Sequence, residues 1–256
     1  MPSLPNDLNG PGPLCPIPKA HRTLVEAHHF WHQAADNYSH PDLFRANLNA
    51  TIQALRNVTF SLQNEKHAFA DFDAWYQPWQ TRMKASSVLS WSKEARNAVV
   101  KQGELHTAST ATVRLLTWKD DELTRLSIAP ETSSEALLST LPVIDLIAKV
   151  SIPSGDLSSA VLELERQWNL PNFRNREVLD ALAAAYGLLS DLLVDAHASL
   201  GRLDCIDDRS PHPSFRATHH RSGTLPCMTA TAELRKERFR VDARIDSVFR
   251  YMGSMV

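Results

Sequence analysis

Apolar residues recur along much of this chain at the three- and four-residue spacing of an amphipathic helix. The pattern covers residues 20–37, 39–66, 86–105 and 175–200. Such spacing puts the apolar side chains of each segment on one face, which must be buried against other elements. The segment 175–200 has the broadest apolar face, so we expect it to close a bundle formed with the other helices.

The segment 86–105 has the clearest boundaries and is predicted to be the central helix of the bundle. Ser86 can accept a hydrogen bond from a backbone N–H of the first turn, and Gly103 can adopt the left-handed conformation in which helices often end. The buried stripe of this helix is predicted to consist of Val88, Trp91, Ala95, Ala98 and Val99.

The period of the pattern changes after this helix. Apolar and polar residues alternate over 107–115, a polar turn follows at 119–121, and 123–128 can return as a second strand. These features predict a β-hairpin near 106–128. Farther along, we expect a short helix over 133–138 and a further helix over 156–168, while the tail has spacings that fit both a strand and a helix.

These elements predict a mainly α protein: a helical bundle with an added β-hairpin and an irregular C-terminal region, α+β overall. Residues 1–18 contain six prolines. Because proline removes backbone donors and blocks both helix and sheet, we expect a flexible arm there. The helical domain is predicted to cover 19–200, with 201–256 as a loop-rich extension.

Composition narrows the classes of function. A net charge of −2 at pH 7 argues against a protein that coats nucleic acid non-specifically. Three cysteines are too few for a disulfide framework, so we expect a cytoplasmic protein. No apolar run reaches the roughly 20 residues of a membrane span, and no membrane partner is expected. The sequence lacks a Gly-rich phosphate loop, a G-x-S-x-G elbow and an H-E-x-x-H motif, and we expect no cofactor.

We interpret one polar helix face and one group of aromatic side chains as structural features. The polar side of 39–66 favours a contact with another helix; it carries Arg45, Asn49, Gln53, Arg56, Asn57 and Gln63. Residues 71–82 bring together four aromatic side chains, Phe72, Trp75, Tyr76 and Trp79. We interpret them as a plug that closes one end of the bundle, in preference to a platform for stacking bases.

A polar cluster on the central helix is the candidate functional site. Asn97 and Lys101 are one helical turn apart, and Arg96 lies about 100° around the helix from Asn97. The three side chains can therefore line one wall of a pocket and hold phosphate through two cations. The structural alternative is that Arg96 and Asn97 form hydrogen bonds to a neighbouring helix.

The run Arg96-Asn97-Ala98-Val99-Val100 resembles the signature of the HEPN superfamily, the higher-eukaryote-and-prokaryote nucleotide-binding domains. These are helical bundles in which a late helix carries Arg, a polar residue that is often Asn, three further residues and then His. The sixth position here is Lys101 instead of His. A lysine ordinarily stays protonated up to about pH 10, so it starts at a disadvantage as a general base at pH 7.

The resemblance implies an RNA- or nucleotide-binding protein that is either an inactive or a weak metal-independent ribonuclease. Arg96, Asn97 and Lys101 would be its catalytic residues, and Arg96 and Lys101 would bind phosphate. Members of the superfamily often place two such helices at a homodimer interface, so the resemblance also implies a homodimer. A toxin–antitoxin or phage-defence role belongs to the same family context.

Histidines and cysteines suggest two metal sites. His28 and His32 are one helical turn apart, the spacing at which two histidines of one helix can bind the same metal ion, although a histidine pair at the edge of a core is more common. Cys205, His212, His219 or His220, and Cys227 could supply four zinc ligands, but their spacing matches no familiar zinc motif. Both sites therefore rank below the phosphate site.

Two further functional hypotheses stand beside RNA or nucleotide binding. In one, the bundle is a non-enzymatic module that binds a protein partner, and the pair Arg96 and Asn97 is structural. In the other, the chain is a metal-dependent helical enzyme that uses His28 and His32. Bound metal in the purified protein would favour the last hypothesis.

Overall fold

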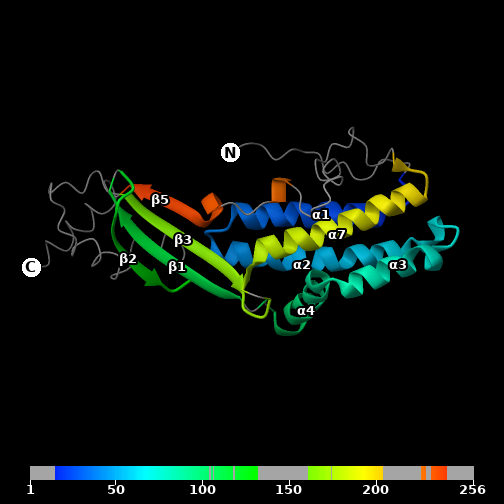
Figure 1. Ribbon diagram of the computed structural model, residues 1–256, viewed down its shortest axis with the longest axis horizontal. Coiled ribbons are helices and arrows are strands. Elements are labelled where there is room, and N and C mark those ends of the chain that lie inside the picture. The colour runs from blue at the N-terminus through cyan, green and yellow to red at the C-terminus, as the bar shows by residue number, and fades with distance from the viewer. Residues whose placement is uncertain are drawn as a thin grey trace, which may run out of the picture. The chain divides into compact units, whose positions relative to one another are not determined.

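The computed structural model describes residues 15–103, 105, 107–117, 119–131, 161–173, 175–203, 226–228 and 232–240. The chain forms two compact units, and each unit is assembled from three separate segments (Figure 1). The helical unit consists of Met1–Ala35, Arg45–His106 and Leu170–Ala230, and the sheet unit of Asp36–Phe44, Thr107–Asn169 and Thr231–Val256. The fold is thus α+β and mainly helical, and segments of the two units alternate along the sequence.

Five long helices shape the described part of the chain. They are α1 (Pro18–Asp36), α2 (Pro41–Asn64), α3 (Phe72–Ala85), α4 (Ser87–Gln102) and α7 (Val178–Ser199) (Figure 1). Short 3₁₀ turns lie at Lys66–Ala68, Pro226–Met228 and Ala232–Arg235. The predicted helices over 20–37, 39–66, 86–105 and 175–200 are confirmed, with ends that shift by one to three residues.

The core of the helical unit is made by the apolar faces that the spacing predicts. Its fully buried members include Leu24, Ala27, Leu48, Ile52, Val58, Leu62, Leu182, Leu189 and Leu193. Trp31 of α1 is 1% exposed, and its indole N–H donates a hydrogen bond of 2.9 Å to the carbonyl of Leu179 in α7. The helix α7 is buried on nearly every side, which explains why its apolar face is so broad.

Helix α4 begins and ends as its sequence predicts. The Ser86 hydroxyl accepts a hydrogen bond from the N–H of Leu89, 3.3 Å away. Gly103 ends the helix with φ +87°, and its N–H donates to the carbonyl of Val99 at 2.9 Å. Four of the five stripe residues are buried; Ala98 is half-buried.

The first turn of α1 is capped by a side chain from the end of α2. Glu65 is 4% exposed, and its carboxylate accepts the backbone N–H groups of Lys19 at 2.8 Å and Ala20 at 3.0 Å. An anionic acceptor is well placed there, because the first N–H groups of a helix have no partner within it. Ile17, which the sequence assigned to a flexible arm, is fully buried.

The aromatic segment forms helix α3 and packs onto α7. Asp71 caps the helix by accepting the N–H of Ala74 at 3.1 Å. Phe72 and Tyr76 are buried, and the indole N–H groups of Trp75 and Trp79 both donate to the Asp195 carboxylate of α7, at 3.0 and 2.6 Å. The structural interpretation is favoured over a stacking platform because ring faces are already occupied: Trp75 stacks on Phe69 with ring centroids 4.6 Å apart, and the Arg82 guanidinium lies 4.8 Å from the centre of the Trp79 ring.

The sheet unit contains an antiparallel sheet in the order β2–β1–β3–β5 (Figure 1). The strands are β1 (Ala108–Leu116), β2 (Glu122–Ile128), β3 (Val161–Leu170) and β5 (Lys236–Arg240), and a two-residue strand, β4 (Arg176–Glu177), precedes α7. The predicted hairpin is confirmed. The predicted helix over 156–168 is wrong, since 161–170 forms β3.

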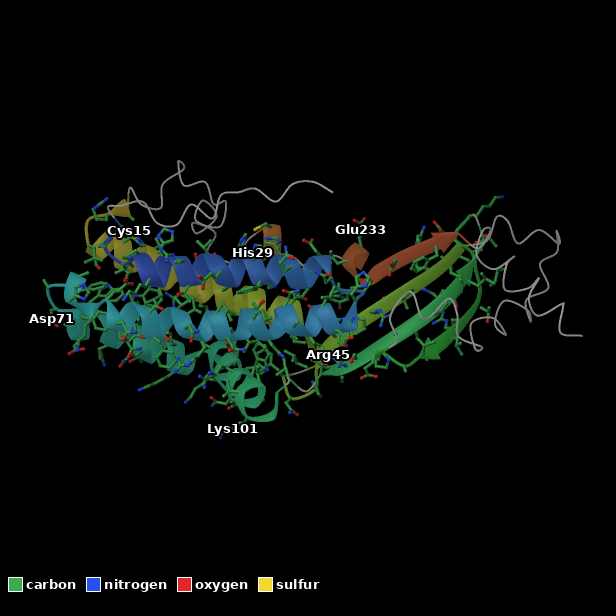
Figure 2. The ribbon with its side chains drawn as sticks, turned by 180° about the vertical axis from the view of Figure 1, so that it is seen from behind. Cys15, His29, Arg45, Asp71, Lys101 and Glu233 are labelled. Atoms are coloured by element: carbon green, nitrogen blue, oxygen red, sulfur yellow. The ribbon has the colours of Figure 1, made fainter. Side chains whose placement is uncertain are left out.

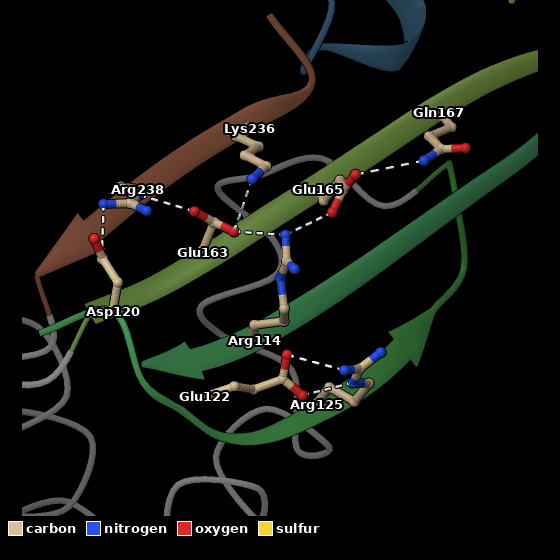
Figure 3. Close-up of polar contacts among 9 residues, drawn as sticks. All are labelled: Arg114, Asp120, Glu122, Arg125, Glu163, Glu165, Gln167, Lys236 and Arg238. Atoms are coloured by element: carbon tan, nitrogen blue, oxygen red, sulfur yellow. Dashed lines mark hydrogen bonds and ion pairs between the residues drawn. The ribbon is translucent and has the colours of Figure 1, made fainter. Parts of the chain in front are cut away.

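A charged network covers one face of this sheet (Figure 3). Glu163 of β3 lies directly opposite Arg114 of β1 and Arg238 of β5 in the strand register. Its carboxylate contacts Arg114 at 2.6 Å and Arg238 at 2.8 Å, although the Glu163 side chain is only 2% exposed. Opposite charges on adjacent strands stabilise their pairing, so this buried carboxylate links the middle of the sheet to β5.

The turn between α1 and α2 and the first residues of α2 belong to the sheet unit. Trp168 of β3 stacks on Phe44, with ring centroids 4.7 Å apart, and its indole N–H donates to the carbonyl of Tyr38 at 3.2 Å. The backbone N–H of Trp168 also donates to the Tyr38 hydroxyl at 3.3 Å. These two polar contacts fix the turn against β3.

Three predictions fall wholly or mostly outside the described residues: the flexible arm over 1–18, of which only 15–18 are described, the short helix over 133–138, and the extension over 201–256. Within that extension, 236–240 forms strand β5. Among the described helices, none combines the length and the apolar character that a membrane crossing requires.

Candidate functional site

A cleft of about 350 Å³ opens between α2, α3, α4 and one residue of α7. Its apolar lining comes from Leu55, Met83, Leu89 and Leu189, and its uncharged polar lining from Thr59, Gln63, Tyr76, Gln80, Ser90 and Ser92. The remaining lining residues are three cations, Arg56, Lys84 and Lys93. A mixed lining with a few convergent polar groups is typical of small-molecule sites.

The charge of the cleft is unbalanced. Arg56, Lys84 and Lys93 come from three different helices, and no Asp or Glu is among the lining residues. Over the described residues, none of the three cations forms a salt bridge with a carboxylate. Three cations in one recess, surrounded by hydroxyl and amide groups, favour an anionic ligand such as a phosphate group.

Arg56 is held in position before any ligand arrives. Its guanidinium donates to the Thr59 hydroxyl at 3.1 Å and lies 4.4 Å above the centre of the Phe60 ring. Both contacts are local to α2, at positions three and four residues farther along the helix. They restrict the guanidinium and so lower the entropy that binding would cost.

Tyr76 forms a neutral polar wall of the cleft. Burial raises the pKa of the Tyr76 hydroxyl above its usual value of 10.0, against smaller opposing effects of a hydrogen bond to Gln63 and the charge of Arg56. The hydroxyl therefore keeps its proton at neutral pH. It can act as a hydrogen-bond donor to an anion without adding negative charge.

The three residues predicted from the central helix lie outside this cleft. Arg96 and Asn97 are half-buried, and Lys101 is exposed near the C-terminal end of α4 (Figure 2). In the described part of the chain, none of the three side chains has a hydrogen bond or an ion pair. The alternative in which Arg96 and Asn97 are bonded to a neighbouring helix therefore finds no support among the described contacts.

Helix geometry nevertheless connects the predicted residues to the cleft. Lys93, Asn97 and Lys101 follow one another at four-residue spacing, which places them along one side of α4. Arg96 lies beside this row, three residues after Lys93. The cleft and the predicted residues thus share one polar side of α4, opposite the stripe that is buried in the core.

The polar side of α2 takes part in the cleft as well. Arg56 and Gln63, which the sequence assigned to a helix–helix contact, both line the cleft. Asn49 does make such a contact, because its side-chain amide donates to the carbonyl of Gly103 at 3.3 Å. Gln63 makes such a contact too, since it forms a hydrogen bond with Tyr76 of α3. The expectation for this face is thus confirmed for Asn49 and Gln63, whereas Arg56 contacts Thr59 and Phe60 of its own helix.

Two groups of histidine and cysteine residues lie elsewhere in the helical unit. In the first, the Nε2 atom of His28 is 3.2 Å from Nε2 of His32 and 3.3 Å from Sγ of Cys227. The Cys227 residue is exposed, but its thiol lies against α1, and the loss of solvent there raises the pKa of the thiol above its ordinary value. The structure thus adds a cysteine, 199 residues away in sequence, to the predicted histidine pair.

The second group is fully buried. Sγ of Cys15 lies 3.4 Å from Nε2 of His197 and 3.7 Å from Nδ1 of His21. The Nδ1 atom of His197 is 2.7 Å from the carbonyl of Leu193. A carbonyl can only accept, so Nδ1 of His197 donates and its Nε2 is left as an acceptor for the thiol. Of the predicted four-ligand set, only Cys227 lies among the described residues.

Comparison with known proteins places the chain in a family. The family described as bacteriophage lambda protein ea47 matches residues 10–250. The chain belongs to the ea47 family. Protein ea47 of Escherichia phage lambda is 31% identical over 171 residues, which cover 65% of this chain and 40% of the phage protein. The chain thus spans about two fifths of the length of that relative, and no solved structure matches it.

Sequence reasoning missed the cleft in this ea47-family chain for a physical reason. Arg56, Lys84 and Lys93 lie on three helices, and only the packing of α2, α3 and α4 brings them together. Each of the three alone has the pattern of an ordinary solvated cation. The signal that could have found them is the polar side of α4, which begins at Lys93 and not at Arg96.

Proposed function

We propose that the chain binds a phosphate-bearing ligand, RNA or a nucleotide, in the cleft between α2, α3 and α4. The observation that carries this proposal is the group of three cations, Arg56, Lys84 and Lys93, without a carboxylate among the lining residues. A phosphate group would neutralise the three cations, and the hydroxyl and amide groups that line the cleft would form hydrogen bonds with the sugar and the base. The volume of about 350 Å³ suits a small ligand or the end of a strand.

The row along α4 extends this proposal to a longer ligand. An RNA with one phosphate in the cleft could continue past Asn97 to Lys101, which is exposed at the end of the helix. In this arrangement Arg96 and Lys101 contact successive phosphates of the backbone. The resemblance of this row to the HEPN signature is part of the same proposal, as are a HEPN-like bundle, a homodimer and a weak or absent metal-independent ribonuclease activity.

The binding test uses the full chain and a fluorescent single-stranded RNA, with a nucleoside monophosphate as competitor. The double variant Lys84→Gln/Lys93→Gln removes two cleft cations, and Lys19→Gln/Lys66→Gln is the matched control that removes two exposed lysines elsewhere on the helical unit. We expect the cleft variant to bind at least tenfold more weakly. For this variant, the slope of log K against the logarithm of the salt concentration should be less steep by about 1.4, because each lost phosphate contact changes the slope by about 0.7.

A second pair of variants tests the row on α4. If Arg96→Ala and Lys101→Gln weaken RNA binding while the cleft variant does not, the ligand lies on the α4 row and the cleft assignment is wrong. If wild-type protein binds neither probe at low salt, the proposed function itself is overturned. RNA cleavage measured in EDTA, with and without Arg96→Ala, separates an active from an inactive site.

A further inference from the structure

The contacts among His28, His32 and Cys227 have a feature that ordinary hydrogen bonding satisfies poorly. One atom, Nε2 of His28, is within 3.3 Å of both Nε2 of His32 and Sγ of Cys227. A ring nitrogen carries either one proton or one lone pair. It can therefore form one well-aligned hydrogen bond, but in this group two atoms compete for it, Nε2 of His32 and Sγ of Cys227.

The buried group around Cys15 provides an internal comparison. There a consistent chain of protons exists, since Nδ1–H of His21 can donate to Sγ of Cys15 and the thiol can donate to Nε2 of His197. The carbonyl of Leu193 fixes the tautomer that this chain needs. Each ring nitrogen in that group has one role toward the thiol, and hydrogen bonding accounts for the geometry.

The distances in the His28 group match those expected around a metal ion. With zinc bonds of roughly 2.0–2.1 Å to nitrogen and 2.3 Å to sulfur, tetrahedral geometry places two nitrogens roughly 3.3 Å apart and a nitrogen and a sulfur roughly 3.5 Å apart. The observed separations are 3.2 Å and 3.3 Å, and all three ligand atoms lie within 4.8 Å of one another. Small outward shifts would give the zinc geometry.

We propose that His28, His32 and Cys227 bind a zinc ion through two imidazole nitrogens and one thiolate. The donor set is the mixed nitrogen and sulfur set that zinc prefers. His28 is buried, His32 is half-buried and Cys227 is exposed, so the site opens to solvent on one side. Water takes the fourth position, as in zinc sites that keep an open coordination position.

The ion would also connect distant parts of the chain. His28 and His32 lie on α1, whereas Cys227 lies on the 3₁₀ turn Pro226–Met228, whose Met228 is fully buried. Zinc would therefore hold this turn on α1 through bonds that exist only in the folded state, and binding would stabilise that arrangement. This inference does not depend on the proposed binding of RNA or nucleotide, because the two sites share no residue.

Cobalt(II) is the probe, because it replaces zinc in such sites and absorbs visible light. The full chain is stripped with a chelator and titrated with cobalt(II), then with zinc(II). We expect one equivalent of tetrahedral cobalt, with a thiolate-to-cobalt charge-transfer band, and displacement of the cobalt by zinc. The band should be lost in Cys227→Ser. His32→Asn should weaken zinc binding by more than roughly 100-fold, because loss of a residue that only supports a ligand already weakens metal binding by roughly 10- to 100-fold.

Two variants serve as controls. His29→Asn changes the neighbouring histidine of α1, and Cys15→Ser changes the cysteine of the buried group. Both should keep the cobalt spectrum. The proposal is overturned if wild-type protein gives no tetrahedral cobalt spectrum, if Cys227→Ser leaves the charge-transfer band in place, or if Cys15→Ser removes it.

Discussion

The capping of α1 by Glu65 gives a sharp test of how a contact between two helix ends stabilises this chain. The perturbation is Glu65→Ala, which removes the acceptor for the N–H groups of Lys19 and Ala20. The Lys19 N–H is only partly buried and can turn to water, whereas the Ala20 N–H is buried. The two donors therefore lose different amounts of free energy.

The magnitude follows from these two environments. Loss of a helix cap typically costs about 1 kcal/mol, which we assign to the Lys19 N–H. A buried donor left without an acceptor costs about 1–3 kcal/mol, which we assign to the Ala20 N–H. Together Glu65→Ala should lower the free energy of unfolding by about 2–4 kcal/mol. The melting temperature should fall by roughly 4–16 °C, since 1 kcal/mol corresponds to about 2–4 °C in a chain of similar size.

The assay is thermal and urea unfolding followed by the helical circular dichroism signal. Glu65→Gln keeps the shape and one acceptor oxygen but turns an amide N–H₂ toward a donor, so its loss of stability should be intermediate. Glu26→Ala, at an exposed position of α1, is the matched control and should change the unfolding free energy by less than about 0.5 kcal/mol. If Glu65→Ala behaves like this control, the capping argument is wrong.

Three further predictions concern other elements. Loss of solvent raises the pKa of Asp191 above its usual value of 3.8, against the charge of Arg82. The folded chain therefore holds this proton more tightly than the unfolded chain, and the ionised form costs stability above the raised pKa. Asp191→Asn should thus raise the melting temperature at pH 7, with a gain that disappears below pH 4. Gly103→Ala should lower the free energy of unfolding measured in urea by about 1–2 kcal/mol, because an alanine is strained at φ +87°. Its Cβ would have no atom within 4 Å to pack against, so no new contact would offset this strain. Glu163→Gln should lower the melting temperature more than Glu165→Gln, since the Glu163 side chain is 2% exposed and that of Glu165 is 26% exposed; equal losses would contradict the role of the buried carboxylate.

The helices could be predicted because each carries its own signal in consecutive residues. Ser86 and Gly103 bound α4 through local backbone chemistry, and the structure places both as expected. Strand β3 was misread for the opposite reason. Its buried side contains Arg166, 1% exposed, among Leu162, Leu164 and Trp168, and a buried arginine conceals the alternation of apolar and polar residues on which a strand prediction depends.

The candidate sites show the same limit. The pair His28 and His32 is visible in sequence because one helical turn separates them, but Cys227 reaches them only through the fold. The capping of α1 by Glu65 and the cations of the cleft are equally non-local. Sequence periodicity predicts which face of a helix is buried; it does not predict which distant side chains meet at the ends and edges of helices.

The interleaving of the two units has a consequence for how this fold can change. Because each unit draws on three separate stretches of the chain, no single cut in the gene separates one unit from the other. A recombination event that exchanged the C-terminal third would bring in a foreign β5 beside the resident β3 and would leave Glu163 without its own Arg238. Natural variants should therefore inherit both units together, and their diversity should come from point substitutions more than from shuffled modules.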